Sequence, residues 1–255
     1  MVLQPRVKLT SHPRDQIKTV MDKRAKGGKR RYLDTVPPEE YRPETGEVIL
    51  SELSLTGLAD LYGSDKGTLK HNYTEVYARL IDELLAGGDR RKAKLKIVEF
   101  GVACAASLRM WANYLPHSDI VGLDIREACG QLCGDLPNVR IEICDPTQWN
   151  TEEVFDLVVD DASHISEQIV SAVRSCWPKV RPGGAYVVED LACTYSEEYA
   201  ASYRNTFKTD AANDRGVLMA LMDELMRITD VRGDVAEVHY YPQLLIIKKR
   251  SLKNS

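Results

Sequence analysis

The chain has 255 residues, of which 44% are hydrophobic and 28% are charged, with a formal net charge of −4. This composition excludes collagen-like, low-complexity and wholly disordered chains, and the length suits one large domain or one domain with an arm. The charge is uneven, because residues 1–31 hold ten Lys or Arg against two acidic residues and so carry +8. The remainder of the chain is an acidic body that carries −12.

The distribution of apolar and basic residues argues against two kinds of partner. No stretch approaches the roughly 18 apolar residues that cross a bilayer, and the first residues lack the apolar segment of a secretory signal. The basic run over 23–31 has no interleaved aromatic side chains of the kind found in nucleic-acid surfaces. We therefore expect a cytoplasmic protein that binds neither nucleic acid nor a membrane.

Strands and helices are predicted to alternate after a polar leading segment. Residues 1–50, rich in Lys, Arg and Pro, are predicted to form a basic, flexible N-terminal arm, and residues 51–255 a single domain. Strands are expected at 95–100, 119–125, 139–144, 155–161, 185–189, 235–241 and 244–249, with a turn at 181–184. Near-continuous apolar strands between helices are typical of a parallel sheet covered on both faces. The predicted fold is α/β: a doubly wound, mostly parallel, Rossmann-like seven-stranded sheet.

Residues at the ends of the predicted strands indicate a nucleoside-containing cofactor, because ligands of such sheets bind beyond the carboxyl ends of the strands. Asp124 ends the second strand, where an acidic side chain can bind both ribose hydroxyls, and Asp145 and Asp160 stand at the next two strand ends. Only Gly101 remains where dinucleotide folds carry a glycine-rich phosphate loop. The pattern favours S-adenosylmethionine (SAM), which has no phosphate, over a nicotinamide or flavin dinucleotide.

Three more carboxylates follow the fourth and fifth strands and predict a cation site. Asp161, Glu189 and Asp190 are expected on neighbouring strand ends about 5 Å apart, where like charges repel unless a cation balances them. Mg²⁺ prefers such oxygen ligands and lowers the pKa of a hydroxyl beside it. His164, three residues after Asp161, is placed to take the proton.

An ordinary structural interpretation stays open for the same residues. Asp161 is also suited to cap the following helix, with His164 in its first turn and Glu189 paired with a nearby cation. The stretch 194–203, which contains Tyr195, Tyr199 and Tyr203, is expected to be either a loop that contacts the acceptor or an exposed surface loop.

Four motifs together resemble a known family. EFGV at 99–102, GLDI at 122–125, DASH at 161–164 and VEDL at 188–191 are similar to motifs of the metal-dependent SAM O-methyltransferases of antibiotic biosynthesis, of the mycinamicin deoxysugar type. The segment YGSDKG at 62–67, followed by His71 and Tyr73, resembles the entry into that family's catalytic domain. The similarity covers about residues 53–250. One departure is Ala103-Cys104-Ala105-Ala106, which stands where the family loop is usually rich in glycine.

The resemblance implies a role for each motif residue. Asp161, Glu189 and Asp190 would be the Mg²⁺ ligands and His164 the general base. Glu99 and Gly101 would flank the methionine part of SAM, Asp124 would bind its ribose, Asp145 would lie near the adenine, and Asp160 belongs to the same cofactor edge.

The function implied is SAM- and Mg²⁺-dependent methylation of a sugar hydroxyl on a small, glycosylated natural product in secondary metabolism, by a homo-oligomeric enzyme. Two alternatives remain at this point. Related proteins of the cephalosporin hydroxylase type use the same fold in oxidative tailoring. The altered loop after Gly101 also suits a non-catalytic SAM-fold binding protein.

Overall fold

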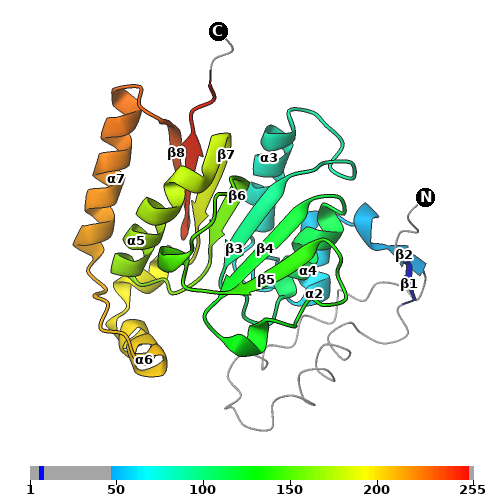
Figure 1. The fold of residues 1–255 in the computed structure, drawn as a ribbon, viewed down its shortest axis with the longest axis horizontal. Helices are drawn as coiled ribbons and strands as arrows, with labels where there is room; N and C mark the ends of the chain where they lie inside the picture. Colours follow the sequence, from blue (N-terminus) through cyan, green and yellow to red (C-terminus); the bar gives the residue numbers. More distant parts are fainter. Residues whose placement is uncertain (1–5, 9–46, 253–255) are drawn as a thin grey trace.

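The structure is a computed structural model, and it describes residues 6–8 and 47–252 (Figure 1). The predicted N-terminal arm over 1–50 therefore lies mostly outside the described residues. Its described parts are β1 (Arg6–Lys8) and β2 (Glu47–Ile49), which pair as a two-stranded antiparallel sheet. Within the described ranges, no helix has the length and apolar character that crossing a membrane requires.

Seven strands form the main sheet in the order β5-β4-β3-β6-β7-β9-β8. They are β3 (Lys96–Phe100), β4 (Asp119–Asp124), β5 (Val139–Ile143), β6 (Phe155–Asp160), β7 (Val180–Val188), β8 (Val235–Tyr241) and β9 (Leu244–Lys249). The pairs among β3 to β7 are parallel, whereas β9 is antiparallel to both β7 and β8. The predicted α/β fold with a mostly parallel seven-stranded sheet is confirmed.

Helices cover both faces of the sheet (Figure 1). They are α2 (Leu55–Tyr62), α3 (Thr74–Leu85), α4 (Ala106–Tyr114), α5 (Ser166–Cys176), α6 (Glu197–Phe207) and α7 (Arg215–Asp230). On one face of the sheet, α2, α3 and α4 pack against strand side chains such as Ile97. On the other face, α5 and α7 pack against the strand side chains that alternate with these, such as Val98. Both residues are fully buried, which explains why these strands are apolar along their whole length.

Two local predictions were wrong. The segment 181–184, expected as a turn, lies inside β7, because a register shift between β6 and β7 lets Val180 pair with Phe155 and Ala185 with Leu157. Most of the stretch 194–203, expected as a loop, belongs to α6. The Ser196 side chain accepts a hydrogen bond from the backbone N–H of Tyr199 at 3.1 Å and so caps this helix.

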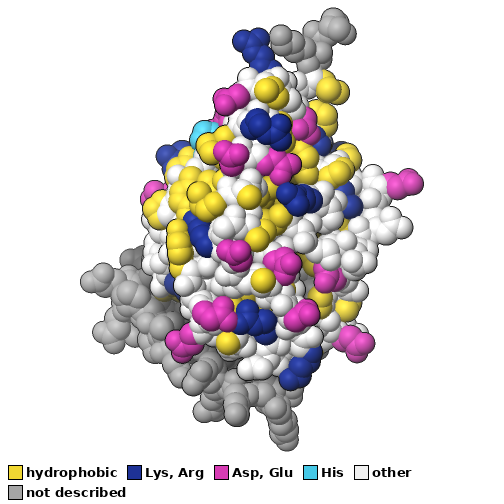
Figure 2. All heavy atoms as spheres, turned by 90° about the vertical axis from the view of Figure 1, so that its left-hand side faces the viewer, with side chains coloured by type: hydrophobic (Ala, Val, Ile, Leu, Met, Phe, Trp, Pro, Cys, Tyr) yellow, Lys and Arg dark blue, Asp and Glu magenta, His cyan; other side chains and the backbone are white. Residues whose placement is uncertain are grey.

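The outer face of α7 is partly apolar. Met219 and Met226 on this helix, and Val231 after it, are exposed. Figure 2, which looks at the side where α7 lies, shows hydrophobic side chains interspersed with Lys, Arg, Asp and Glu over this face.

Gly101 allows the loops after β3 and β6 to touch. Its φ is +89°, and a Cβ atom there would lie 2.1 Å from the carbonyl oxygen of Asp161. Its own N–H donates to the carbonyl oxygen of Leu123 at 2.8 Å. A side chain at this position would have to displace backbone, so Gly101 holds two predicted site segments at their closest approach.

We expect Gly101→Ala to lower the free energy of unfolding by roughly 3 kcal/mol or more, because it combines backbone strain with a backbone clash. Gly134→Ala is the matched control. Gly134 is exposed, and a Cβ there would meet nothing closer than the carbonyl oxygen of Gln131 at 3.7 Å. Its change should stay within about 0.5 kcal/mol. Urea denaturation measures both, and equal effects of the two substitutions would contradict this role of Gly101.

Candidate functional site

The predicted site residues lie together at the edge of the sheet formed by the carboxyl ends of the parallel strands. Phe100 at the end of β3 pairs with Asp160 of β6, and Asp160 pairs with Val188 of β7. Asp161 and Glu189 are the next residues of their strands and therefore lie side by side. The Asp161 N–H donates to the Phe100 carbonyl oxygen, and the Glu189 N–H to that of Asp160.

The ammonium group of Lys66 lies between these carboxylates. Its Nζ atom donates to Asp161 Oδ2 at 2.5 Å and to Glu189 Oε2 at 2.8 Å, and it lies 3.7 Å from Glu99 Oε1. The Lys66 side chain is completely buried. Lys66 was not predicted as a site residue, although it stands in the YGSDKG segment. Its contact with Glu189 is the pairing with a nearby cation that the ordinary structural interpretation expected.

Glu99 connects the same cluster to α4. The Ser107 hydroxyl donates to its Oε1 at 2.5 Å, and the Trp111 indole N–H donates to its Oε2 at 2.6 Å. Glu99 is fully buried. The structure therefore places this predicted cofactor residue against α4 and Lys66, and its role toward SAM stays a prediction.

One ammonium does not balance three carboxylates in this cluster. Burial alone would lower the pKa of Lys66, but Asp161, Glu189 and Glu99 outweigh it and hold that pKa well above its ordinary value. Burial raises the pKa of Glu99 and of Glu189 against the opposing effect of Lys66. A further cation close to these carboxyl groups would favour their ionised form.

The donor atoms around Asp190 fit a divalent cation. Asp161, His164 and Asp190 each offer a ligand atom within 4.8 Å of the others, and so do Asp65, His71 and Asp190. The buried Nε2 of His71 has no hydrogen-bond partner among the described residues and lies 3.3 Å from Asp190 Oδ1. Carboxylate oxygens such as those of Asp161 and Asp190 are the donors that Mg²⁺ and Mn²⁺ prefer, whereas an imidazole nitrogen is more typical of Zn, Cu, Fe and Ni sites.

Glu189 does not join either of these groups. Its Oε1 accepts a hydrogen bond from the Tyr77 hydroxyl at 2.5 Å, and its Oε2 is held by Lys66. Asp190 is held by a residue close to Tyr77 in the chain: the Tyr73 hydroxyl donates to Asp190 Oδ1 at 2.9 Å. The structure thus brings Asp161 and Asp190 together as predicted, whereas the metal-ligand role of Glu189 stays a prediction.

His164 lies beside Asp161 on a left-handed backbone. Its φ is +54°, and its Nε2 is 3.7 Å from Asp161 Oδ1. Helix α5 begins at Ser166 with no side-chain cap, so the interpretation of Asp161 as a helix cap with His164 in the first turn was wrong. The ring of Tyr199 on α6 lies 6.0 Å from the His164 ring, which places α6 over this part of the site.

Asp124 is held by the loop after Gly101 and by an arginine. Its Oδ2 accepts from the N–H groups of Val102 and Ala103 at 3.0 and 3.3 Å. The Arg126 guanidinium binds both carboxylate oxygens, at 3.0 and 2.8 Å. Burial would raise the pKa of Asp124, but hydrogen bonds from Arg126 outweigh it and keep the pKa low. Arg126, which sequence reasoning missed, occupies the acceptor atoms that a ribose would use.

Two isoleucines border Asp124 with exposed apolar side chains. Ile125 follows it directly and is 45% exposed, and Ile143 pairs with Asp124 across the sheet and is 43% exposed. Asp145 is exposed and accepts from the N–H of Thr147 at 2.8 Å. Two exposed apolar side chains thus neighbour Asp124, and the place of Asp145 near an adenine stays a prediction.

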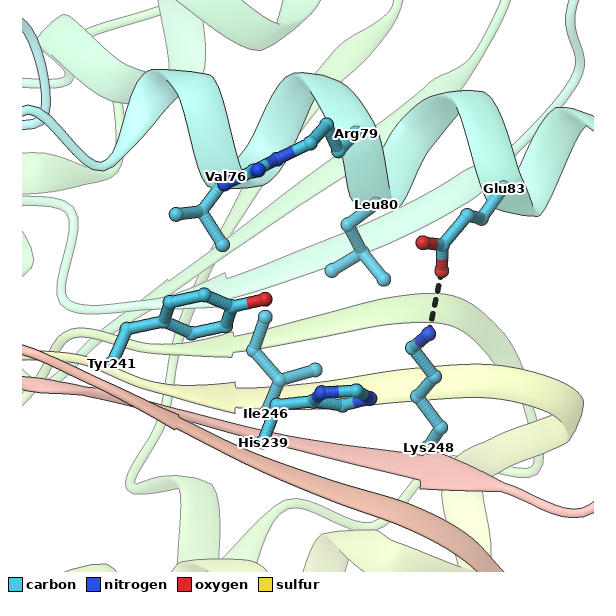
Figure 3. A pocket seen from close by; sticks show the side chains of 8 residues that line it. All are labelled: Val76, Arg79, Leu80, Glu83, His239, Tyr241, Ile246 and Lys248. Carbon is cyan, nitrogen blue, oxygen red and sulfur yellow. Dashed lines mark hydrogen bonds and ion pairs between the residues drawn. The ribbon is translucent and has the colours of Figure 1, made fainter.

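The cavity between α3 and the last two strands is a different place (Figure 3). It measures about 200 Å³ and is lined by Val76, Arg79, Leu80, Glu83, His239, Tyr241, Ile246 and Lys248. An ion pair of 2.6 Å joins Lys248 to Glu83 at one end. None of the predicted site residues lines it, and it is smaller than the roughly 300 Å³ of typical ligand pockets.

Comparison with known proteins identifies related enzymes, although no family model matches the chain. The 8-demethyl-8-alpha-L-rhamnosyl tetracenomycin-C 2'-O-methyltransferase of Streptomyces olivaceus is 30% identical over 220 residues, which cover 77% of this chain and 55% of that protein. Mycinamicin VI 2''-O-methyltransferase of Micromonospora griseorubida is 30% identical over 157 residues, or 55% and 37% of the two chains. The chain is a relative of antibiotic sugar O-methyltransferases. It spans about half the length of the first of these relatives and less of the second.

The fold agrees with this relationship. The methyltransferase MycE of the mycinamycin pathway, solved with Mg, SAH and mycinamycin VI, superimposes with a TM-score of 0.63 at 24% identity. The match covers 80% of this chain and 56% of that one. The predicted resemblance and the SAM-dependent methyltransferase fold are confirmed.

Asp160 should make the stability of the protein fall as the pH rises. Its side chain is buried and accepts a hydrogen bond from the Tyr186 hydroxyl at 3.1 Å, and burial raises its pKa to about 7. A carboxyl whose pKa is higher in the folded than in the unfolded state stabilises the fold below about pH 4 and loses that contribution as the pH passes 7.

Asp160→Asn should therefore become more stable relative to the unchanged protein between pH 4.5 and pH 8, by at most roughly 4 kcal/mol for a pKa difference of about three. Urea unfolding of both proteins at the two pH values measures this. A difference in unfolding free energy that does not change with pH would contradict the assignment.

Proposed function

We propose that this chain transfers the methyl group of SAM to a hydroxyl of a sugar on a small natural product, with Mg²⁺ at the strand-end carboxylates. The observation that carries the proposal is the meeting of Asp161, His164 and Asp190 at the same sheet edge as the Gly101 loop and Asp124. The relatives named above are O-methyltransferases whose names specify sugar positions.

The Gly101 loop and Asp124 would hold the cofactor, which supplies an electrophilic methyl group on its sulfonium. Asp124 would bind two ribose hydroxyls after its ion pair with Arg126, whose side chain is 47% exposed, is broken. Ile125 and Ile143 offer the adenine apolar contacts. Glu99, Asp145 and Asp160 are further cofactor-site residues of this proposal.

Asp161, Asp190 and Glu189 would hold the metal, which lowers the pKa of an acceptor hydroxyl beside it. His164 takes the hydroxyl proton on its Nε2, and Asp161, 3.7 Å away, favours the resulting imidazolium. Much of the rate would come from holding the acceptor oxygen in line with the methyl group. A cytoplasmic location and a homo-oligomer belong to the same proposal and stay predictions.

Removal of divalent metal should abolish methylation. The full chain is incubated with SAM and a panel of glycosylated natural products, before and after treatment with EDTA, and the products are measured by mass spectrometry. We expect one acceptor to gain the mass of a methylene, the gain to vanish with EDTA, and excess Mg²⁺ to restore it. Methylation that is indifferent to EDTA would remove the metal from the proposal, and a gain of one oxygen would show oxidative tailoring instead.

His164→Ala should lower turnover by about 10²- to 10⁴-fold, because it removes the base that accepts the hydroxyl proton. The affinity for SAH, measured by calorimetry, should remain within about three-fold, since the cofactor residues are untouched. His239→Ala is the control, because His239 is half-exposed on β8, bonds Glu237 and lies outside the candidate site. Turnover by the His164 variant equal to that of the His239 variant would refute the base assignment.

A further inference from the structure

The ammonium group of Lys66 already pairs with carboxylate oxygens that are also candidate metal ligands. Its Nζ uses Asp161 Oδ2 and Glu189 Oε2, whereas Asp161 Oδ1 faces His164. Asp161 is thus shared between an internal cation on one side and the candidate metal position on the other.

The chain builds this lysine rigidly into the site. The Lys66 N–H donates to Ser64 Oγ at 3.3 Å, and its carbonyl oxygen accepts from the Thr74 N–H at 3.1 Å. A Cβ atom on the next residue, Gly67, would lie 2.2 Å from Asp60 Oδ1, so the loop packs directly on α2. These contacts fix the lysine backbone on both sides, and the side chain then runs into the buried cluster.

A divalent cation at Asp161 and Asp190 would therefore meet a like charge nearby. Both cations draw on the oxygens of Asp161, and in a buried site their repulsion is weakly screened. At the same time the ammonium keeps Asp161 and Glu189 in place when no metal is bound. The two effects oppose one another: the lysine stabilises the carboxylates and weakens their hold on a metal.

We infer that Lys66 is the resident cation of this cluster, a positioning residue that holds Asp161 and Glu189 in place and competes with the divalent metal for their oxygens. The inference rests on the metal part of the proposed function. Its consequence is a metal that binds weakly and exchanges readily, because part of its electrostatic attraction is already satisfied by the protein.

Lys66→Met tests this, since methionine is unbranched, fills a similar volume and carries no charge. The full chain and its variants are titrated with Mn²⁺, and the free ion is measured by electron paramagnetic resonance. We expect the variant to bind Mn²⁺ about ten-fold more tightly or better. Its Tm should be lower than that of the unchanged protein without metal and should rise more when Mn²⁺ is added.

Two further lysine substitutions serve as controls. Lys66→Arg keeps the charge and should bind Mn²⁺ about as the unchanged protein does. Lys70→Met removes a charge from the same loop, but at a half-exposed side chain that pairs with Asp65, and should change the Kd by less than about three-fold. Lys66→Gln, which is neutral and keeps a hydrogen-bond donor, takes the place of Lys66→Met if that variant does not fold.

A purely structural lysine predicts the opposite result. Mn²⁺ binding by Lys66→Met or Lys66→Gln that is equal to or weaker than that of the unchanged protein would overturn the competition, while leaving the proposed function intact. Absence of Mn²⁺ binding in every protein, the unchanged chain included, would instead refute the metal part of the proposed function and this inference with it.

Discussion

A buried ammonium among three carboxylates, of which Glu99 and Glu189 are also buried, ties together the parts of the chain that form the site. Lys66 comes from the loop after α2, Glu99 from β3, and Asp161 and Glu189 from the segments after β6 and β7. The buried charges of Lys66, Glu99 and Glu189 are not stable in the core alone, because an unpaired charge removed from water costs several kcal/mol. Each segment therefore depends on the others for its position, and the site exists only in the folded sheet.

The same cluster links the two halves of the proposed active site. On the cofactor side, Glu99 binds Ser107 and Trp111 of α4, the helix that follows the Gly101 loop. On the metal side, Tyr73 and Tyr77 bind Asp190 and Glu189 from the start of α3. The short segment from Lys66 to Tyr77 thus contacts all three of the predicted metal carboxylates.

Much of this arrangement could be predicted from the sequence, because apolar strands that end in acidic residues place those residues at one edge of a parallel sheet. The strands, Gly101 and the carboxylates after β6 and β7 all follow from that rule. Lys66 does not, since its partners are 95 and 123 residues away in the chain, and local spacing does not show which cation neutralises a distant carboxylate. Arg126 was missed for a different reason: Asp124 is suited equally to an arginine and to a ribose. The segment 181–184 was predicted to be a turn because Pro and two consecutive glycines are typical of turns. The same residues are also tolerated in a strand where the register shifts, and local sequence does not separate the two cases.

In the proposed active site, cofactor and divalent cation bind side by side at this sheet edge. Crystals of the full chain grown with SAH and Mn²⁺ test it most directly, by anomalous scattering from the metal. We expect one Mn²⁺ in contact with Asp161 and Asp190, and SAH against Gly101 with its ribose on Asp124. Mn²⁺ at another place, or SAH bound away from the Gly101 loop, would contradict it.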